Sequence, residues 1–327
     1  MNPSSRIKVY LLGGLGNQLF GASFAQSLNF NFPGKIIISD RLIPFGSNPK
    51  RYLMLDQFPI DLVSNLEIQR SSKRLSALIR SSSFIRRLMW HSYRMTPGRT
   101  RINLKEFFEF ERIPLEGFDV LDYCNDWFFA EYNRHSNQWG KFFPNSNLIP
   151  TEFLDEIANG IVCHVRIGDY LNYPQTYQLL HENYYLRAIE LLKHKCNDSK
   201  QGVVIVTESK AELKRFYPNL ASGARIIGKE DLQSDMIAFS LMANAKRLVA
   251  ANSTFSLWAA WFGLQNRDET VVPDLAESEL RQDGLRELNW TILNPLTGKR
   301  VANEDYATWY KTKLTNFHET IQRLKTR

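Results

Sequence analysis

GIVCHVRIGDY, residues Gly160–Tyr170, is the stretch that decides the fold. Its first half is apolar and rich in β-branched residues, which is typical of a strand buried in a parallel sheet. His164 and Arg166 lie two residues apart, so on an extended chain they project from the same face. Gly168 lets the backbone turn where the strand ends. Because open α/β sheets bind ligands beyond the carboxyl ends of their strands, the segment predicts both a strand and a binding site.

Arg166 is the chemical centre of this prediction. A guanidinium at a strand end suits a phosphate, because its planar fork can donate two parallel hydrogen bonds. The alternative is a structural ion pair between Arg166 and Asp169 that binds nothing. The segment alone leaves both interpretations open.

Strands and helices alternate after this segment, which predicts a parallel, doubly wound sheet. The predicted strands are residues 202–207, 225–227, 247–251 and 270–272, and the predicted helices are residues 183–195, 211–217 and 232–244.

The strand at 247–251 runs into a hydroxyl-rich turn and a helix that ends at Gly263. Ser253 or Thr254 is placed as the N-cap of this helix. Exposed amides at a helix N-terminus also bind anions, so ordinary capping and an anion site are both open. Since Arg166 lies on another strand of the same sheet, a nucleotide diphosphate explains the two features together.

The N-terminal half opens with a second βαβ pattern: a strand at 7–12, GGLGNQLF at 13–20, a helix at 22–30 and a strand at 35–39. Glycines in such a turn allow a ligand to approach the backbone closely. Gly14, Gly16 and Asp40 superficially match a dinucleotide fingerprint, but Leu19 occupies the position of the third glycine. A nicotinamide-dependent oxidoreductase is therefore a weak alternative.

A basic stretch lies between Glu67 and Glu106, and it contains no acidic residue. Apolar side chains interleave with its ten cations, which are Arg70, Lys73, Arg74, Arg80, Arg86, Arg87, Arg94, Arg99, Arg101 and Lys105. One interpretation is an insertion that contacts an anionic membrane surface. The other is a solvated helical pair that covers its own domain. Nucleic-acid binding is not indicated, because no nucleic-acid module accompanies the patch.

Composition bounds the class of protein. The chain has 327 residues, enough for two domains, and 43% of them are hydrophobic, which favours a large core over disorder. A net charge of +7 favours anionic partners. Three widely spaced cysteines without a CxxC pair indicate neither a zinc site nor a disulfide framework. Without a signal core or a bilayer-length apolar run, we expect a cytoplasmic protein, with peripheral contact at the inner face of the membrane as an option.

Three motifs taken together resemble those of the α-1,2-fucosyltransferases of glycosyltransferase family 11. They are GGLGNQLF at 13–20, HVRIGDY at 164–170, and the segment from 241 through ANSTFSLWAAW at 251–261. The NYYLRAI helix at 183–189 and the aromatic run at 123–129 also match. That aromatic run could border a glycan or could simply pack in a core.

The resemblance implies an α/β chain of GT-B architecture, in which two Rossmann-like domains face a cleft. We expect an acceptor-side domain at 1–150 with the basic insertion at about 68–105, a domain at 151–300 that binds GDP-β-L-fucose, and a helical tail at 301–327. The implied reaction is inverting transfer of L-fucose to the 2-hydroxyl of a terminal galactose, with no metal or other cofactor. A lipid-linked oligosaccharide is the acceptor that would suit a basic, membrane-facing patch.

Site residues follow from the resemblance and the motifs together. Arg166 is expected to stabilise the leaving diphosphate, and Asp169, or as a second choice His164, to act as general base. The other residues expected to contact the nucleotide sugar are Gly14, Gly16, Asn17 and Gln18 from the first domain, and His164, Glu208, Asn252, Ser253, Thr254 and the Phe255 backbone from the second.

Two departures from the family pattern bear on this site. The family usually has a second arginine at the position of Ile167, so we expect Arg166 to carry more of the phosphate charge, aided by Lys246 or Arg247. The family's Ser-Asp-Asp appears as Thr207-Glu208-Ser209, which leaves recognition of the ribose or base by Glu208 open. A non-catalytic GDP-sugar-binding protein would share all of these features and remains an alternative.

Overall fold

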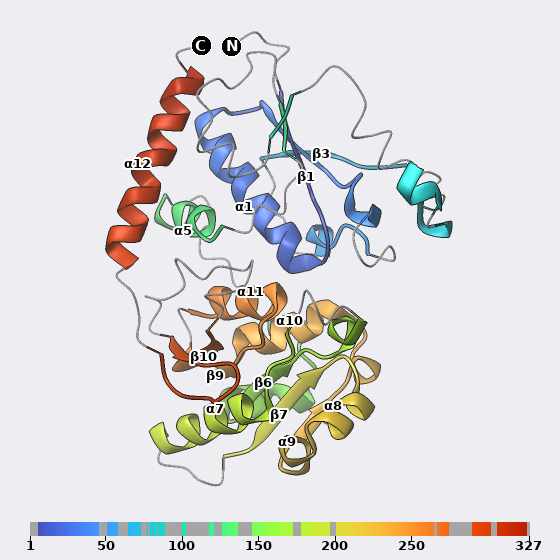
Figure 1. Ribbon diagram of the computed structural model, residues 1–327, viewed down its shortest axis with the longest axis vertical. Coiled ribbons are helices and arrows are strands. Elements are labelled where there is room, and N and C mark those ends of the chain that lie inside the picture. Colours follow the sequence, from blue (N-terminus) through green and yellow to red (C-terminus); the bar gives the residue numbers. More distant parts are fainter. Residues whose placement is uncertain are drawn as a thin grey trace. The chain divides into compact units, whose positions relative to one another are not determined.

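The chain folds into two compact units, Met1–Lys141 with Ala307–Arg327, and Phe142–Tyr306, in the computed structural model. Each unit is built around a parallel sheet (Figure 1). The structure describes residues 6–45, 51–57, 65–72, 77, 79–82, 84–88, 100–102, 118–120, 126–136, 146–172, 178–196, 201–264, 267–274, 290–301 and 306–325. The predicted α/β class with two Rossmann-like units is confirmed.

The first unit contains a five-stranded sheet in the order β3-β2-β1-β5-β4, with every neighbouring pair parallel. Its strands are β1 (Ile7–Tyr10), β2 (Ile36–Ser39), β3 (Glu67–Gln69), β4 (Thr100–Ile102) and β5 (Phe118–Val120). Short 3-10 turns follow at Ile43–Phe45 and Leu55–Gln57. Strands β1 and β2 were predicted. The other three are only three residues long and carry no alternation that the sequence could reveal.

Helix α1 (Leu15–Asn31) packs between the sheet and two later helices, α5 (Phe128–His135) and α12 (Tyr306–Lys325). Phe317 of α12 lies against the rings of Phe128 and Phe129, and Phe24 of α1 also contacts Phe129. All four rings are buried. The described part of the aromatic run is therefore core, and the C-terminal helix is part of the first unit.

The second unit contains a six-stranded parallel sheet in the order β11-β10-β9-β6-β7-β8. Its strands are β6 (Ile161–Val165), β7 (Val203–Thr207), β8 (Arg225–Ile227), β9 (Arg247–Val249), β10 (Glu269–Pro273) and β11 (Thr291–Leu293). Its helices are α6 (Leu154–Asn159), α7 (Glu182–Lys195), α8 (Lys210–Phe216), α9 (Pro218–Ser222), α10 (Asp235–Asn244) and α11 (Thr254–Phe262), with 3-10 turns at Ser146–Leu148, Thr151–Phe153, Gly168–Asn172 and Lys229–Asp231.

Alternation along β6 divides its side chains between two faces. Cys163, Val165 and Ile167 lie in one buried cluster with Tyr184 and Tyr185 of α7. His164 and Arg166 therefore project from the opposite face, as the sequence predicted.

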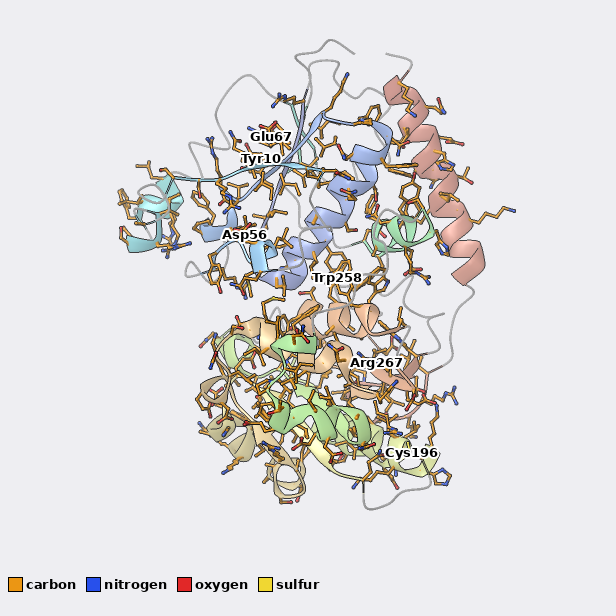
Figure 2. The ribbon with its side chains drawn as sticks, turned by 180° about the vertical axis from the view of Figure 1, so that it is seen from behind. Tyr10, Asp56, Glu67, Cys196, Trp258 and Arg267 are labelled. Carbon is orange, nitrogen blue, oxygen red and sulfur yellow. The ribbon has the colours of Figure 1, made fainter. Side chains whose placement is uncertain are left out.

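The C-terminal ends of α10 and α11 are joined by Arg267 (Figure 2). One guanidinium nitrogen, Nη2, donates to the carbonyls of Met242 and Ala243 on α10, at 2.7 and 3.1 Å, and of Ala259 on α11, at 3.3 Å. Burial lowers the pKa of Arg267 to about 9, from its ordinary value near 12.5. The contacts give the Met242 and Ala243 carbonyls at the end of α10 a donor, and they fix α11 against α10.

The first unit ends at Lys141, whereas the sequence-based boundary is residue 150. The 3-10 turn at Ser146–Leu148 packs on α10 and so belongs to the second unit. Within the basic insertion, the described residues include two short helical stretches, at 79–81 and 84–88, and the rest of 73–99 falls largely outside the described part. Among the helices that the structure describes, none has the length and apolar character needed to cross a bilayer.

Candidate active site

The strand order of the second unit creates a switch point beside β6. The chain begins this sheet at β6, adds β7 and β8 on one side, and then crosses over to add β9, β10 and β11 on the other. In open α/β sheets, ligands bind outside the carboxyl ends of the strands where the order reverses. Here that point lies between β6 and β9, so the residues that follow these strands form the candidate site.

Arg166 directly follows β6 at this switch point. Its guanidinium forms an ion pair with the carboxylate of Glu208, the residue after β7. It also lies over the ring of Tyr170, with 5.6 Å between the guanidinium carbon and the ring centroid. The side chain remains 20% exposed. Arg166 is thus held on two sides while part of it is accessible to a ligand.

Glu208 lies against the residues that follow β6. Besides pairing with Arg166, it accepts the N–H of Ile167 at 3.3 Å. A Cβ added to Gly168 would lie 3.4 Å from the Glu208 carboxyl carbon, so the glycine lets the two strand ends approach closely. The predicted role of Glu208 was contact with the nucleotide sugar. In the structure the carboxylate orients the Arg166 fork, and its contact with the nucleotide sugar stays a prediction.

Tyr170 links Arg166 to the segment after β9. Its ring lies under the guanidinium, and its hydroxyl donates to the carbonyl of Asn252 at 2.7 Å. The Asn252 amide in turn donates to the carbonyl of Gln178 at 2.6 Å. Asn252 was predicted to contact the donor, but its amide nitrogen holds two segments of the unit together.

The N-terminus of α11 completes the site from the β9 side. Ser253 is its N-cap, and the Ser253 hydroxyl accepts the N–H of Phe255 at 3.3 Å. The Phe255 amide was predicted to bind phosphate and here has an internal partner at the long end of the hydrogen-bond range. Thr254 is partly exposed at the first position of the helix. This terminus offers amides and the positive end of a helix dipole beside the switch point.

His164 is buried on the same face of β6 as Arg166, and 6.0 Å separates its ring centroid from that of Phe255. Burial, and then the charge of Arg166, lower the pKa of His164 to about 3. A general base must hold a proton near the working pH, so this imidazole is a poor proton acceptor. The site therefore disfavours His164 as the base. The Asp169 side chain lies outside the described residues, and its role stays a prediction.

Lys246 and Arg247 do not lie near Arg166. Lys246 precedes β9, and Arg247 is its first residue. The Arg247 side chain donates to the carbonyl of Asn159, which lies at the end of α6, just before β6 begins. The amino end of a parallel strand is opposite the edge where Arg166 sits. The expectation that these cations assist with phosphate is wrong, because they lie at the amino end of β9 and the site lies at its carboxyl end.

In the first unit, the glycine-rich turn connects β1 to α1. Gly13 has a φ of 66°, in the left-handed region that favours glycine. Helix α1 begins at Leu15, earlier than the predicted start at residue 22, so Gly16 and Asn17 lie in its first turn behind the N-cap Gly14. Donor contacts from these three residues stay predictions.

Gln18 has a different place from the one predicted. Its side chain is buried, and its Nε2 donates to the carbonyls of Gly13 and Tyr52, at 3.1 and 2.9 Å. Its Oε1 accepts the N–H of Met54 at 2.8 Å. Because these bonds use both amide hydrogens and the carbonyl oxygen, Gln18 braces the turn and is not free to contact a donor sugar.

Comparison with known proteins decides the family. The sequence model described as glycosyl transferase family 11 matches residues 7–294, nearly the whole chain. The chain belongs to glycosyl transferase family 11. It is therefore a glycosyltransferase, and the resemblance carried by its three motifs is confirmed.

Individual relatives of this family 11 chain are distant. An alpha-1,2-colitosyltransferase of Escherichia coli is 25% identical over 277 residues, which cover 80% of this chain and 89% of the relative. The O-antigen biosynthesis glycosyltransferase WbnK of Escherichia coli is 23% identical over 283 residues, covering 80% and 92%. Among solved structures, the fucosyltransferase NodZ from Bradyrhizobium aligns at 14% identity with a TM-score of 0.49, covering 84% of this chain and 96% of NodZ.

Membership of family 11 excludes the oxidoreductase alternative, and the position of Asp40 in the first unit also argues against it. Asp40, which would bind ribose in that alternative, accepts the backbone N–H of Ser71 at 2.6 Å.

The structure also shows where Ile167 lies, at the position where the family usually has its second arginine. Ile167 is fully buried on the α7 face of β6, away from the face that carries Arg166.

Sequence reasoning missed two positioning groups, the Tyr170 hydroxyl and the Glu208–Arg166 pair. Both contacts join residues more than 40 positions apart, 82 for Tyr170 and Asn252 and 42 for Arg166 and Glu208. Tyr170 lies inside the motif that the sequence singled out, so its proximity to Arg166 was detectable, whereas its partner was not.

Proposed function

We propose that this family 11 enzyme transfers L-fucose from GDP-β-L-fucose to the 2-hydroxyl of a terminal galactose, with inversion at the anomeric carbon and without a metal. The observation that carries the proposal is the switch point of the second unit, where the Arg166 guanidinium and the N-terminus of α11 follow adjacent strands. Both are groups that bind phosphate.

The leaving group defines the task of Arg166. As the bond between the fucose anomeric carbon and the β-phosphate oxygen breaks, the electron pair leaves with GDP and negative charge grows on that oxygen. A guanidinium already held by Glu208 and Tyr170 stabilises this charge without having to reorganise during the reaction. Loss of one such contact costs about a hundredfold or more in rate.

The anion-binding helix terminus takes the other phosphate. The hydroxyls of Ser253 and Thr254 and the first amides of α11 surround the place where β9 ends. A phosphate oxygen can replace the 3.3 Å contact between the Phe255 amide and Ser253, since charge-assisted hydrogen bonds are shorter and stronger.

The acceptor proton needs a base. As the galactose 2-hydroxyl attacks the anomeric carbon, its proton passes to a carboxylate, and Asp169 on the 3-10 turn after β6 is our choice. The low pKa of His164 supports this choice over the imidazole.

The sugar and linkage rest on family membership and relatives. One relative is named an alpha-1,2-colitosyltransferase, which supports the same linkage while naming a different sugar. The other is named for O-antigen biosynthesis, which supports a cell-surface glycan as the acceptor. Guanine and fucose themselves are implied by the three motifs.

The direct test incubates the purified protein with GDP-fucose and lactose and follows the release of GDP and the formation of a trisaccharide. We expect a trisaccharide whose new linkage, read by NMR, joins α-fucose to O2 of galactose, at the same rate with and without EDTA. Asp169→Asn should lower turnover while retaining GDP binding.

Three results would contradict the proposal. GDP binding with no transfer to any β-galactoside would identify a non-catalytic binder. A faster reaction with a colitose donor would reassign the sugar. A rate abolished by EDTA and restored by a divalent cation would refute the metal-free mechanism.

A further inference from the structure

The basic insertion of the first unit presents an apolar face that the proposed reaction does not use. Phe84 is 72% exposed and Leu88 is 59% exposed, the two highest values among the exposed large apolar side chains of the described residues. They are four positions apart on one helical stretch, 84–88, so they lie on the same side of it. Two such side chains on one helical face mark an interaction surface.

The stretch is held so that this face stays outward. Ile79 in the preceding turn is buried and anchors the insertion to the unit. The Ser82 hydroxyl accepts the N–H of Ile85 at 3.4 Å and begins the helical stretch. Arg86 folds back, and its Nη1 donates to the carbonyls of Ile79 and Arg80, each at 3.4 Å. Figure 1 shows the stretch at the edge of the first unit, beyond β3.

The surrounding charge identifies the partner. Arg87 is exposed and flanks Phe84 on the helical wheel. The segment between Glu67 and Glu106 has ten cations and no anion, more than the net charge of +7 of the whole chain. The rest of the chain is therefore net acidic, and the segment that carries Phe84 and Leu88 is the basic part of the sequence.

We propose that Phe84 and Leu88 insert into an anionic lipid surface, with Arg87 and the neighbouring cations on the headgroups. Apolar side chains next to arginines on a short amphipathic stretch are the pattern of interfacial membrane binding. Cations near an anionic surface are attracted to its headgroups, and the insertion of apolar side chains adds to this attraction. Nucleic acid would engage the cations but would leave Phe84 and Leu88 in water, so lipid accounts for more of the surface.

The test sediments the full-length protein with vesicles, in the absence of sugar donor. Binding to vesicles of phosphatidylglycerol and phosphatidylcholine should exceed binding to phosphatidylcholine alone by about tenfold or more, and should weaken between about 0.1 M and about 1 M salt. Phe84→Ser/Leu88→Ser should lower the partition coefficient by about tenfold or more.

A matched control removes one phenylalanine and one leucine elsewhere. Phe30 and Leu296 are 49% and 51% exposed, and Phe30→Ser/Leu296→Ser should bind vesicles within about twofold of the parent protein. Turnover with soluble lactose should be the same for the Phe84→Ser/Leu88→Ser variant as for the parent, so a failure here is separable from a failure of the proposed reaction.

Other outcomes would overturn the lipid assignment. Equal binding of parent and Phe84→Ser/Leu88→Ser to anionic vesicles would exclude this face as the contact. A concentration-dependent dimer that the double variant abolishes would make the face an interface between two copies. Binding to RNA without binding to anionic vesicles would assign the cations to nucleic acid.

Discussion

At the residue scale, Arg166 depends on a neighbour of opposite charge. Glu208 fixes the direction of the guanidinium and partly offsets its charge, and both side chains are largely buried. Removing Arg166 alone would leave the Glu208 carboxylate beside the expected phosphate, where it would repel the ligand. Any substitution of Arg166 must therefore be compared with a variant that also neutralises Glu208.

His164 carries a testable pH dependence. Its folded-state pKa is about 3, against an ordinary 6.5, so the unfolded chain takes up a proton first as the pH falls. Stability is then lost progressively below pH 6.5. Between pH 7 and pH 5 this single group should cost about 2 kcal/mol, measured by urea unfolding at both values. His164→Asn should lack that loss.

The control for this experiment is His194→Asn, which removes a histidine from the exposed last turn of α7. It should follow the pH dependence of the parent protein. If His164→Asn also follows the parent, His164 does not titrate as its burial requires.

At the element scale, the segment between β9 and α11 is fastened by two tyrosines. Tyr184 of α7 donates to the carbonyl of Ala250, and Tyr170 donates to the carbonyl of Asn252, each at 2.7 Å. The two bonds are alike in length and burial, but only Tyr170 also contacts Arg166. They therefore form a matched pair for separating stability from ligand binding.

Replacing each hydroxyl tests this arrangement. Tyr170→Phe and Tyr184→Phe each leave a buried carbonyl without its donor, so each should lose about 1–3 kcal/mol of unfolding free energy. Tyr170→Phe should in addition weaken GDP binding, by up to about tenfold, because the N-cap of α11 is no longer tied to the residue under Arg166. Calorimetry should show parental GDP affinity for Tyr184→Phe. Equal effects of the two variants on GDP affinity would remove Tyr170 from the positioning role.

The sequence predicted these elements unevenly. Strands β6 and β7 and helix α7 were found because their apolar runs are long and their ends carry glycines and caps. Strands β3, β4, β5 and β11 are three residues long and were missed, because only their neighbours in the sheet make them strands, whereas the equally short β8 was predicted from its place in the strand–helix alternation. The residues of the site were also predicted unevenly. Arg166 and Ser253 sit beside local signals, whereas the roles of Glu208 and Gln18 depend on distant partners.

At the scale of the whole molecule, each unit has its own sheet with its own switch point. The last helix, α12, shows why a boundary read along the chain is incomplete. Phe317 and Lys313 of α12 contact Tyr132 and Asp126, so the C-terminal segment completes the first unit after the second has been built. Only tertiary packing reveals this return, because the helix pattern alone does not name its partner.

The most direct measurement of the central claim is calorimetric binding of GDP to Glu208→Gln and to Arg166→Gln/Glu208→Gln. The single variant keeps the guanidinium, keeps a side-chain oxygen that can accept its hydrogen bond and removes the repulsive negative charge, so it should bind GDP at least as tightly as the parent protein. The double variant loses a charged contact to phosphate, worth about 1.5–3 kcal/mol, so its affinity should fall by about tenfold to a hundredfold. Equal GDP affinity in the two variants would show that Arg166 does not hold the diphosphate and would contradict the account.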